Sequence, residues 1–348
     1  MSNKVLIIGD THWGVRSGNP IYFDYFAKFF ENVFEYVDAN SIDTIIQLGD
    51  MFDKRKSIDF LSLHHAQQKF LTPCQERGIK LYVISGNHDC YYKSTNTVNS
   101  VQLLKTSNMV VFDNAPGTDS INGVDFDFFP WINDENLQSS LEYMKRSKSK
   151  FAVGHFEFAN FRLHKHQIAD AGMDHTVCKN YTLVFSGHYH TISRKDNILY
   201  TGTPYELDWN DWNDKKGFWV FDTSTNDIEF VRNELTLYEK IDYDEDNLLD
   251  VSHLGDKFVK LTIKNKRSQY KFDTYFQAIM NQKPYDVQII DDEISKSVQR
   301  SMDSKVEFAT TPDMVNFVVD NMETVLDKTI LKKMIADIFI EATELAKL

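Results

Sequence analysis

Short apolar runs that end abruptly at a glycine or at a potential metal ligand recur five times in the first 190 residues of this chain. The runs cover residues 5–8, 45–48, 81–85, 151–153 and 183–186. Apolar runs of this length bounded by glycine predict buried strands. In open α/β sheets, ligands gather outside the carboxyl ends of such strands. The pattern therefore predicts one sheet edge that collects Asp, Asn and His side chains, which is the layout of a metal-centred site.

The segments between these runs predict the rest of the fold class. Apolar residues recur at helical spacing from Tyr22 to Val37 and again from Phe60 to Glu76. Alternation of strand and helix predicts right-handed crossovers and a largely parallel sheet. From about Val124 the predicted strands have shorter connections, which indicates a second, mixed sheet. We therefore expect an α/β fold: two mixed β-sheets packed as a sandwich, flanked by helices, with a small α+β cap domain and a C-terminal helical pair behind them.

Composition changes twice along the chain, and these changes predict three parts. The first part covers residues 1–234; the second, 235–295, reads as a small α+β unit. The third, 296–348, contains two amphipathic helical stretches, the first beginning at Thr311-Pro312, where a capping residue precedes a proline. Such terminal helices either complete a core or form a docking surface for a partner helix. Periodicity alone favours the core role.

Bulk composition limits the classes of protein that this chain can represent. Its hydrophobic content of 42% and aromatic content of 14% exclude disorder over most of its length. No stretch approaches the roughly 20 apolar residues of a membrane span, and the first residues lack the pattern of a signal peptide. Three cysteines are too few for a disulfide framework. We expect a reduced, cytoplasmic protein without membrane contact.

Net charge bears on whether this chain binds nucleic acid. A formal charge of −13 argues against a strong nucleic-acid binder, because phosphate contacts rely on Lys and Arg. Bound divalent metals would add positive charge, however, and basic clusters occur at Lys54-Arg55-Lys56, at residues 145–150 and at residues 264–267. Such clusters are usually solvated surface, so each one is only a weak indication of a DNA contact.

The residues that follow the apolar runs form a coherent set of metal ligands. Each piece alone has a simpler explanation as a turn or a polar loop. Together they offer carboxylate, imidazole and amide ligands without cysteine, which suits Mn, Fe or Zn rather than the all-oxygen sites of Mg or Ca. The pieces are Asp10-Thr11-His12, Gly49-Asp50-Met51-Phe52-Asp53, Gly86-Asn87-His88-Asp89, Gly154-His155 and Gly187-His188-Tyr189-His190.

In order and spacing, this block resembles the motifs of calcineurin-like metallophosphoesterases, from the first residues to about Tyr200. The resemblance implies that Asp10, His12 and His190 hold one metal ion. It implies that Asn87, His155 and His188 hold a second ion, and that Asp50 bridges the two. His88 would then be the catalytic histidine, with Asp89 orienting its ring. The remaining histidines are expected on the surface or in packing roles: His64, His65, His164, His166, His175 and His253.

Within the superfamily, the chain most resembles the SbcD-like nuclease branch, which works with SMC-like ABC ATPases in DNA break processing. That likeness implies two Mn²⁺ ions, 3′-to-5′ exonuclease activity on duplex ends and endonuclease activity on single strands. It makes the middle part a DNA-facing cap and the terminal helices the docking site for the ATPase coiled coil, which reverses the core role favoured above. Asp53 stands where eukaryotic and archaeal relatives have His, so the resemblance does not carry over any role of that His in exonuclease selectivity.

The branch also implies a homodimer, for which residues 60–70, with Leu61, Leu63 and His64, are the candidate interface; burial within the monomer is the alternative. Lys54, Arg55 and Lys56 are the candidate substrate contacts. Two other functions compete with the nuclease. One is a metallophosphatase that acts on phosphoproteins or small phosphoesters, and the other is a non-catalytic scaffold that binds DNA ends.

Overall fold

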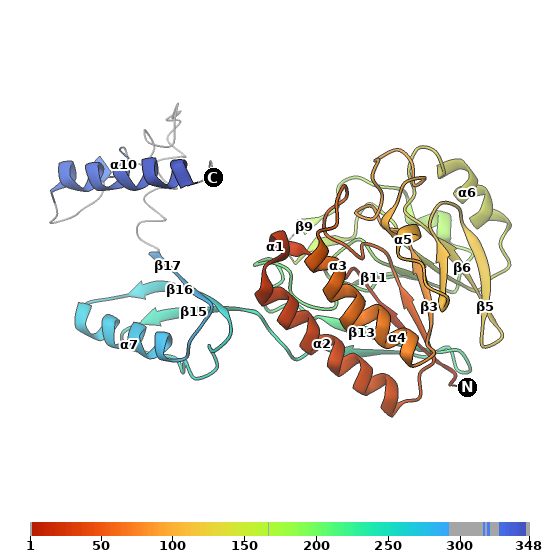
Figure 1. The fold of residues 1–348 in the computed structure, drawn as a ribbon, viewed down its shortest axis with the longest axis horizontal. Helices are drawn as coiled ribbons and strands as arrows, with labels where there is room; N and C mark the ends of the chain where they lie inside the picture. The colour runs from red at the N-terminus through yellow and green to blue at the C-terminus, as the bar shows by residue number, and fades with distance from the viewer. Residues whose placement is uncertain (1, 166, 292–315, 317–318, 321–326, 346–348) are drawn as a thin grey trace. The chain divides into compact units, whose positions relative to one another are not determined.

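The computed structural model describes residues 2–165, 167–291, 316, 319–320 and 327–345 (Figure 1). The chain divides into two compact units, Met1–Tyr238 and Glu239–Leu348. The sequence placed a boundary after residue 234, close to this division. Within the described residues, no helix is long and apolar enough to cross a membrane.

The first unit contains two six-stranded sheets. The first sheet has the order β14-β13-β1-β2-β3-β4. In it β1 to β4 run parallel, β13 pairs antiparallel with β1, and β14 pairs antiparallel with β13. Its strands are β1 (Lys4–Ile8), β2 (Thr44–Gln47), β3 (Lys80–Ile84), β4 (Met109–Phe112), β13 (Gly217–Asp222) and β14 (Ile228–Arg232). The parallel core with an antiparallel edge makes this sheet mixed.

The second sheet has the order β11-β12-β10-β7-β6-β5, with four parallel strands between two antiparallel edge strands. Its strands are β5 (Gly117–Ile121), β6 (Val124–Phe129), β7 (Phe151–Gly154), β10 (Leu183–Ser186), β11 (Ser193–Lys195) and β12 (Ile198–Tyr200). A small hairpin of β8 (Arg162–His164) and β9 (Gln167–Ile168) lies outside both sheets. The predicted sandwich of two mixed sheets is confirmed.

One apolar core joins the two sheets. Alternate residues along the strands, such as Ile7 and Tyr82 from the first sheet and Phe128 and Phe185 from the second, are fully buried in it. The rings of Tyr82 and Phe128 stack with centroids 5.1 Å apart across the interface. Each buried aromatic side chain removes a large apolar area from water. This core therefore holds the two sheets, and the ends of their strands, in fixed relative positions.

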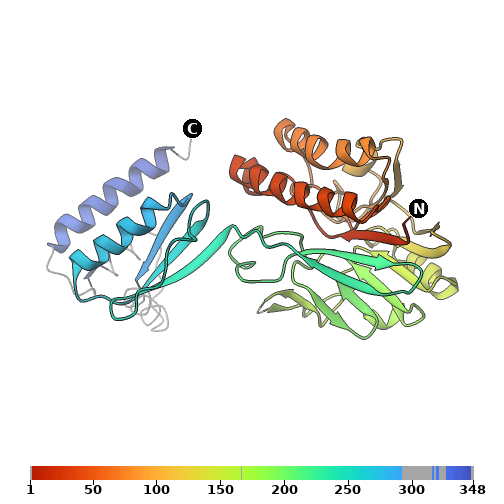
Figure 2. The same cartoon turned by 90° about the horizontal axis from the view of Figure 1, so that it is seen from below.

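Helices cover the outer face of the first sheet (Figure 2). The longest, α2 (Pro20–Ala39), begins with the Asn19 side chain accepting from the Ile21 amide and with proline at the first helical position. The predicted helix over residues 60–76 is one continuous helical segment. It consists of α3 (Phe60–Ala66), the π-helix η1 (Gln67–Leu71) and α4 (Thr72–Glu76). Shorter helices are α1 (Val15–Gly18), α5 (Ser100–Leu103), α6 (Leu137–Arg146) and η2 (His175–Cys178).

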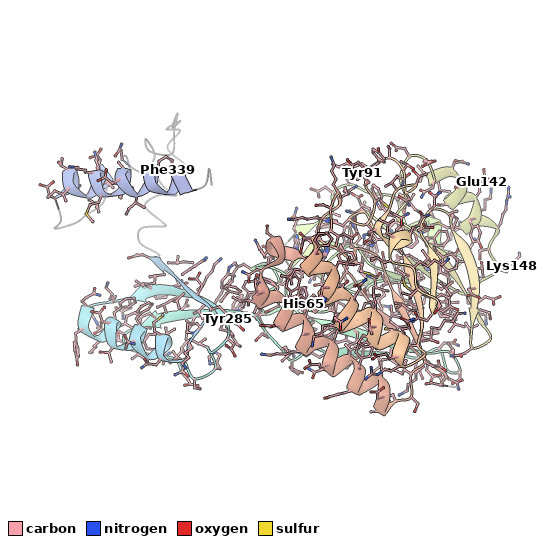
Figure 3. All side chains as sticks on the ribbon, in the orientation of Figure 1. His65, Tyr91, Glu142, Lys148, Tyr285 and Phe339 are labelled. Atoms are coloured by element: carbon pink, nitrogen blue, oxygen red, sulfur yellow. The ribbon has the colours of Figure 1, made fainter. Side chains whose placement is uncertain are left out.

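The second unit begins with a small α+β fold, as the sequence predicts. It comprises β15 (Tyr238–Asp244), β16 (Phe258–Asn265), α7 (Gln269–Asn281) and β17 (Asp286–Asp291), with the sheet order β15-β16-β17. Tyr243, Leu261, Phe272 and Ile279 form its core. The last described helix, α10 (Lys328–Leu345), carries Phe339, which is labelled in Figure 3. The predicted helix start at Thr311-Pro312 lies outside the described residues.

Candidate metal centre

The carboxyl ends of five strands, three from the first sheet and two from the second, deliver all the predicted metal ligands. β1 leads to Asp10 and His12, β2 to Asp50, and β3 to Asn87. From the second sheet, β7 leads to His155, and β10 leads to His188 and His190. Parallel strands that run in the same direction end at the same edge, so residues far apart in the chain meet here.

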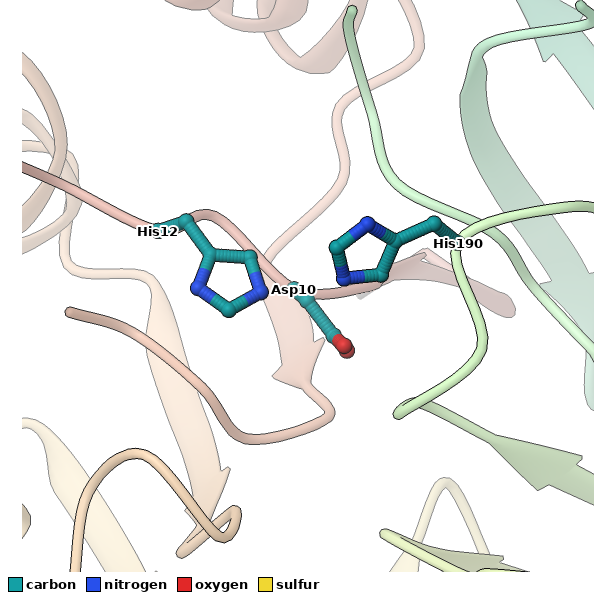
Figure 4. Close-up of side chains that lie close together, drawn as sticks. All are labelled: Asp10, His12 and His190. Atoms are coloured by element: carbon teal, nitrogen blue, oxygen red, sulfur yellow. The ribbon is translucent and has the colours of Figure 1, made fainter. Parts of the chain in front are cut away.

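Asp10, His12 and His190 form the first ligand group. One ligand atom from each lies within 4.8 Å of the others. The rings of His12 and His190 have centroids 5.1 Å apart, and Figure 4 shows both rings beside the Asp10 carboxylate. One carboxylate and two imidazoles facing one point can hold a divalent transition metal.

Asp50, His155 and His188 form the second group, again with ligand atoms within 4.8 Å of one another. The Oδ1 of Asn87 lies 2.9 Å from both His155 Nε2 and His188 Nδ1, so the amide faces the same point. His155 Nδ1 donates to the carbonyl oxygen of Leu48 over 2.8 Å. This bond directs Nε2 toward Asp50, whose carboxylate lies 3.4 Å away.

Asp50 also contacts the first group, since its Oδ2 lies 3.9 Å from His12 Nε2. One carboxylate therefore lies beside both ligand groups, which is the arrangement that a bridging ligand requires. Both groups contain the residues that the sequence assigned to two metal ions, with Asp50 between them.

The protonation of the site fits a pair of cations. Burial lowers the pKa of His188 and His190 to about 3 and holds that of His12 well below its usual range, so these rings present lone pairs. Both ring nitrogens of His12 are buried without a hydrogen-bond partner. Although burial opposes the charged ring, the carboxylates of Asp50 and Asp10 raise the pKa of His155 to about 10. The site thus concentrates negative charge and unpaired lone pairs that divalent ions would satisfy.

The glycines that precede the ligands leave no space for a side chain of their own, because the acidic ligands pack directly against them. A Cβ at Gly86 would lie 2.2 Å from Asp50 Oδ1, and one at Gly187 would lie 2.5 Å from Asp10 Oδ1. The Gly-ligand pairs at the strand ends are therefore required by close packing around the two acidic ligands. With nitrogen and oxygen donors but no sulfur, the site suits Mn, Fe or Zn.

His88 lies at the rim of this centre. Its ring meets the His12 ring edge-on with centroids 5.0 Å apart, and its backbone amide donates to Asp50 Oδ1 over 2.7 Å. Its Nδ1 donates to the Asp53 carbonyl oxygen at 2.5 Å. Since Nδ1 is occupied, Nε2 is the nitrogen left to meet a substrate, which suits the role expected of a catalytic histidine.

The resemblance implied that Asp89 orients the His88 ring. In the structure the Asp53 carbonyl oxygen accepts from that ring instead. The Asp89 carboxylate instead accepts from the Gly86 amide at 2.9 Å, the Met51 amide at 3.1 Å and the Ser100 hydroxyl at 3.1 Å. Asp89 is buried, and it joins the loop after β3 to the loop after β2. Its adjacency to His88 in the sequence could not reveal which way its side chain points.

Lys54, Arg55 and Lys56 follow Asp53 and so lie on the loop that holds His88. The Arg55 guanidinium lies 5.3 Å from the ring centroid of Trp131, and Lys56 Nζ lies 5.5 Å from that of Tyr91. The structure therefore brings this basic run beside aromatic residues near the centre.

Two residues near the centre escaped the sequence argument. His164 was expected on the surface or in packing, yet its ring centroid lies 5.8 Å from that of His190. Lys216 is buried, and its Nζ donates to the His190 carbonyl at 2.8 Å, to Thr203 Oγ1 at 2.8 Å and to Asp211 Oδ1 at 2.6 Å. Neither follows a strand–glycine pattern, so no local signal identifies it.

The other outlying histidines have the ordinary roles expected of them. His65 stacks on Phe23 with centroids 4.3 Å apart, and His175 pairs with Asp196 at 2.9 Å. His64 and His253 lie outside the two ligand groups. His166 lies outside the described residues.

Comparison with known proteins agrees with this geometry. Residues 3–191 match the calcineurin-like phosphoesterase family. Exonuclease subunit 1 of Enterobacteria phage T4 is 31% identical over 346 residues, which cover 98% of this chain and 100% of that protein. The DNA double-strand break repair protein Mre11 of Nanoarchaeum equitans is 25% identical over 228 residues, covering 56% of this chain and 58% of that protein.

Among solved structures, a phosphatase from Mycoplasma pneumoniae is similar at 12% identity with a TM-score of 0.39, over 66% of this chain and 92% of that one. The family match spans more than half of the sequence and includes every residue of both ligand groups. Since one relative also aligns with almost the whole length, this chain belongs to the calcineurin-like phosphoesterase family.

Proposed function

We propose that this chain is a two-metal DNA nuclease that acts as an exonuclease on duplex ends, in the 3′-to-5′ direction, and as an endonuclease on single strands. The observation that carries the proposal is the pair of ligand groups joined by Asp50, with His88 held beside them. The relatives support DNA as the substrate, because one is named an exonuclease subunit and another a DNA break repair protein.

Asp10, His12 and His190 would hold one ion, and Asn87, His155 and His188 the other, with Asp50 shared between them. Bound divalent ions, which we propose to be Mn²⁺, supply Lewis acidity that polarises phosphoryl oxygens and lowers the pKa of water. Four imidazoles and one amide are neutral ligands. They repel a phosphodiester anion less than carboxylates in the same positions would.

His88 contributes directly to the reaction. With Nδ1 donating to the Asp53 carbonyl, the doubly protonated ring can donate a hydrogen bond from Nε2 to a phosphoryl oxygen and then pass that proton to the leaving 3′- or 5′-oxygen, which leaves the neutral ring. The Asp50 carboxylate accepts from the His88 amide, so the loop that carries the ring is fastened to the shared ligand. This contact positions the proton donor relative to the metal centre.

We further propose that α10 binds the coiled coil of an SMC-like ABC ATPase and that the α+β fold of the second unit faces DNA as a cap. On α10, the side chains of Ile330, Met334 and Ile338 are 60%, 57% and 62% exposed. Their four-residue spacing places them on one helical face, which is how a helix binds in an apolar groove or against another helix.

A homodimer is the remaining part of the proposal. On α3, Phe60 is 90% exposed and Leu61 46% exposed. Large exposed apolar side chains next to each other mark an interaction surface more often than isolated ones do. We propose that this end of α3, with Leu63 and His64, pairs with a second copy of the chain.

The test of the nuclease function measures cleavage of blunt duplex and single-stranded DNA with Mn²⁺ and with Mg²⁺, alongside p-nitrophenyl phosphate. We expect Mn²⁺-dependent DNA cleavage and slow hydrolysis of the monoester. His88→Ala should lower DNA cleavage at least about 100-fold, since a lost general acid costs this much. Calorimetric Mn²⁺ binding by the two groups that Asp50 joins should persist, because His88 belongs to neither of them; its own candidate group is formed with His12 and Asp53. His175→Ala is the matched control.

Two results would contradict the proposal. Rapid hydrolysis of the monoester with intact DNA would identify a phosphatase, and DNA binding without cleavage under any metal would identify a scaffold. If His88→Ala cleaves normally, the assignment of the proton donor is wrong even where the nuclease function holds.

A further inference from the structure

We propose that a cavity beside His88, which we call the loop cavity, binds an unpaired nucleobase of the DNA strand being cleaved. The inference rests on the proposed nuclease function and specifies where that site takes its substrate. The loop cavity lies between the segment from Lys54 to Ile58 and the segment from Tyr91 to Leu104, and it has a volume of about 340 Å³. This volume is at the lower end of the range for small-molecule sites.

The chain itself connects the loop cavity to the metal centre. Lys54 directly follows Asp53, whose carbonyl accepts from the His88 ring. Asp89, on the other side of His88, lines the cavity and is hydrogen-bonded to Met51 and Ser100. A strand whose phosphate lies at His88 can therefore place an adjacent nucleotide in the cavity.

Charge distinguishes the loop cavity from two other cavities of the described surface. Lys54, Arg55 and Lys56 line it, and its one acidic residue, Asp89, is committed to three hydrogen-bond donors. A second cavity of about 460 Å³ has Asp125 and Glu142 against Arg146 and Lys148, and a third, of about 330 Å³, has Glu31, Glu35 and Asp38 against Lys69 and Arg77. In a chain with a net charge of −13, the loop cavity is the one of these three that suits a polyanion.

The walls of the loop cavity suit a flat aromatic ligand. Tyr91 is 39% exposed, and the side chains of Val98 and Leu103 are 52% and 85% exposed, so apolar surface faces the space. Lys56 lies over the Tyr91 ring, and Arg55 over Trp131. Arg55 Nη1 is buried without a hydrogen-bond partner. Aromatic and cationic groups side by side are how proteins stack and hold unpaired bases.

The cavity would read the base by stacking rather than by a pattern of hydrogen bonds. Every base offers a π-face, so stacking on Tyr91 tolerates any sequence. A base paired within a duplex cannot enter a cavity of this size, so entry selects single strands and frayed ends. The same nuclease centre would thereby favour unpaired over paired nucleotides next to the cleaved bond.

The test compares Tyr91→Ala, Tyr91→Phe and Lys56→Ala with the parent protein on a short single strand with Mn²⁺. We expect Tyr91→Ala to raise KM about 5- to 150-fold, the range for one lost stacking contact, with kcat changed less than twofold. Tyr91→Phe keeps the ring and should behave as the parent. Lys56→Ala should raise KM, whereas the control Lys148→Ala, beside Glu142 in the second cavity, should not (Figure 3). Hydrolysis of bis(p-nitrophenyl) phosphate, which has no base, should stay unchanged.

A second arm identifies the nucleotide. A single abasic position is moved along the strand, and in the parent protein it should weaken cleavage at one bond. In Tyr91→Ala the same abasic position should have no further effect, because the contact is already lost. The loop cavity is not a base site if the abasic and Tyr91→Ala effects multiply, or if Tyr91→Ala slows the small diester equally.

The remaining outcomes separate this inference from the proposed function. A parent protein that hydrolyses the small diester but cleaves no DNA overturns the nuclease proposal itself, and the base site with it. A change of molar mass in Tyr91→Ala by light scattering would show that a second copy of the chain covers the cavity, since Leu63 of the proposed dimer face also lines it. That result would also overturn the base site.

Discussion

At the scale of single residues, three of the metal ligands have strained backbones. His12, Asp50 and His188 have φ angles of 43°, 50° and 83°, in the left-handed region that non-glycine residues avoid. Such strain costs on the order of 1 kcal/mol or more at each residue and persists only where the surroundings hold it. Here the amides of Thr11 and His12 both donate to the Asp50 carbonyl, so the strained residues fix one another. These backbone contacts thus hold His12 and Asp50 next to each other.

Lys216 is the residue whose contribution can be tested most directly. It supports the His190 carbonyl from a buried position and is paired with Asp211. Lys216→Met should destabilise the fold by roughly 3–5 kcal/mol, because it leaves the Asp211 charge buried alone. Adding Asp211→Asn should restore part of that stability in urea denaturation, yet Mn²⁺ affinity should stay about 10- to 100-fold weaker. A double variant with normal Mn²⁺ affinity would show that Lys216 does not position His190.

The candidate metal ligands could be grouped from the sequence because each lies within three residues after a glycine that ends a strand. Lys216, His164 and the Asp53 carbonyl could not, because their positions depend on contacts between segments that are distant in sequence. Lys216 is 26 residues from the carbonyl that it supports. Asp89 shows the same limit, since its neighbour in the chain is His88 but its partners are amides of two loops.

At the scale of elements, neighbouring strands continue to pair beyond their ends. β1 and β2 are parallel, and Trp13 and Phe52, past their ends, still form a bridge. The two ligand-bearing loops therefore run side by side, which brings His12 to Asp50. The strand pattern predicted both sheets. The π-helical segment η1 could not be predicted, because Pro73, just after it, would by itself indicate that a new helix starts there.

The exposed face of α10 gives a prediction at this scale. Met334→Asp places a charge between Ile330 and Ile338. It should lower affinity for the proposed partner ATPase at least about tenfold, because the carboxylate would lose its hydration in the interface. Its effect on basal DNA cleavage should be small, because α10 carries none of the candidate metal ligands and is separate from the α+β fold proposed to face DNA. Asp337→Asn, an exposed change on the same helix, is the control for pull-down or calorimetry. Unchanged affinity after Met334→Asp would exclude this face as the docking surface.

At the scale of the whole molecule, the first unit fastens the segment where the chain leaves it. The Glu206 carboxylate accepts from the Leu237 amide at 2.6 Å and from the Tyr238 amide at 3.0 Å. Glu206 is buried, and the same loop continues to Asp211, the partner of Lys216. One polar loop therefore contacts both the start of β15 and the support of His190. The same loop therefore stabilises both the last residues of the first unit and the lysine that supports His190.

Glu206 should make the stability of the protein depend on pH. Burial raises its pKa from 4.5 to about 7, so between these pH values the folded state keeps a proton that the unfolded state has released. The stability contributed by this group is therefore present below pH 4.5, falls as the pH rises through 7 and then levels off. The total change is roughly 3 kcal/mol.

Glu206→Gln removes the titration while its amide oxygen can still accept from both backbone amides. The variant should gain stability relative to the parent as the pH rises from 5 to 8, by up to roughly 3 kcal/mol in urea denaturation. Comparing the two proteins at each pH cancels the titration of the metal ligands, which both retain. Glu234→Gln, an exposed change before the same segment, should show no such trend. A stability difference that stays constant from pH 5 to 8 would mean that Glu206 titrates as an ordinary surface carboxyl and carries its charge in the fold.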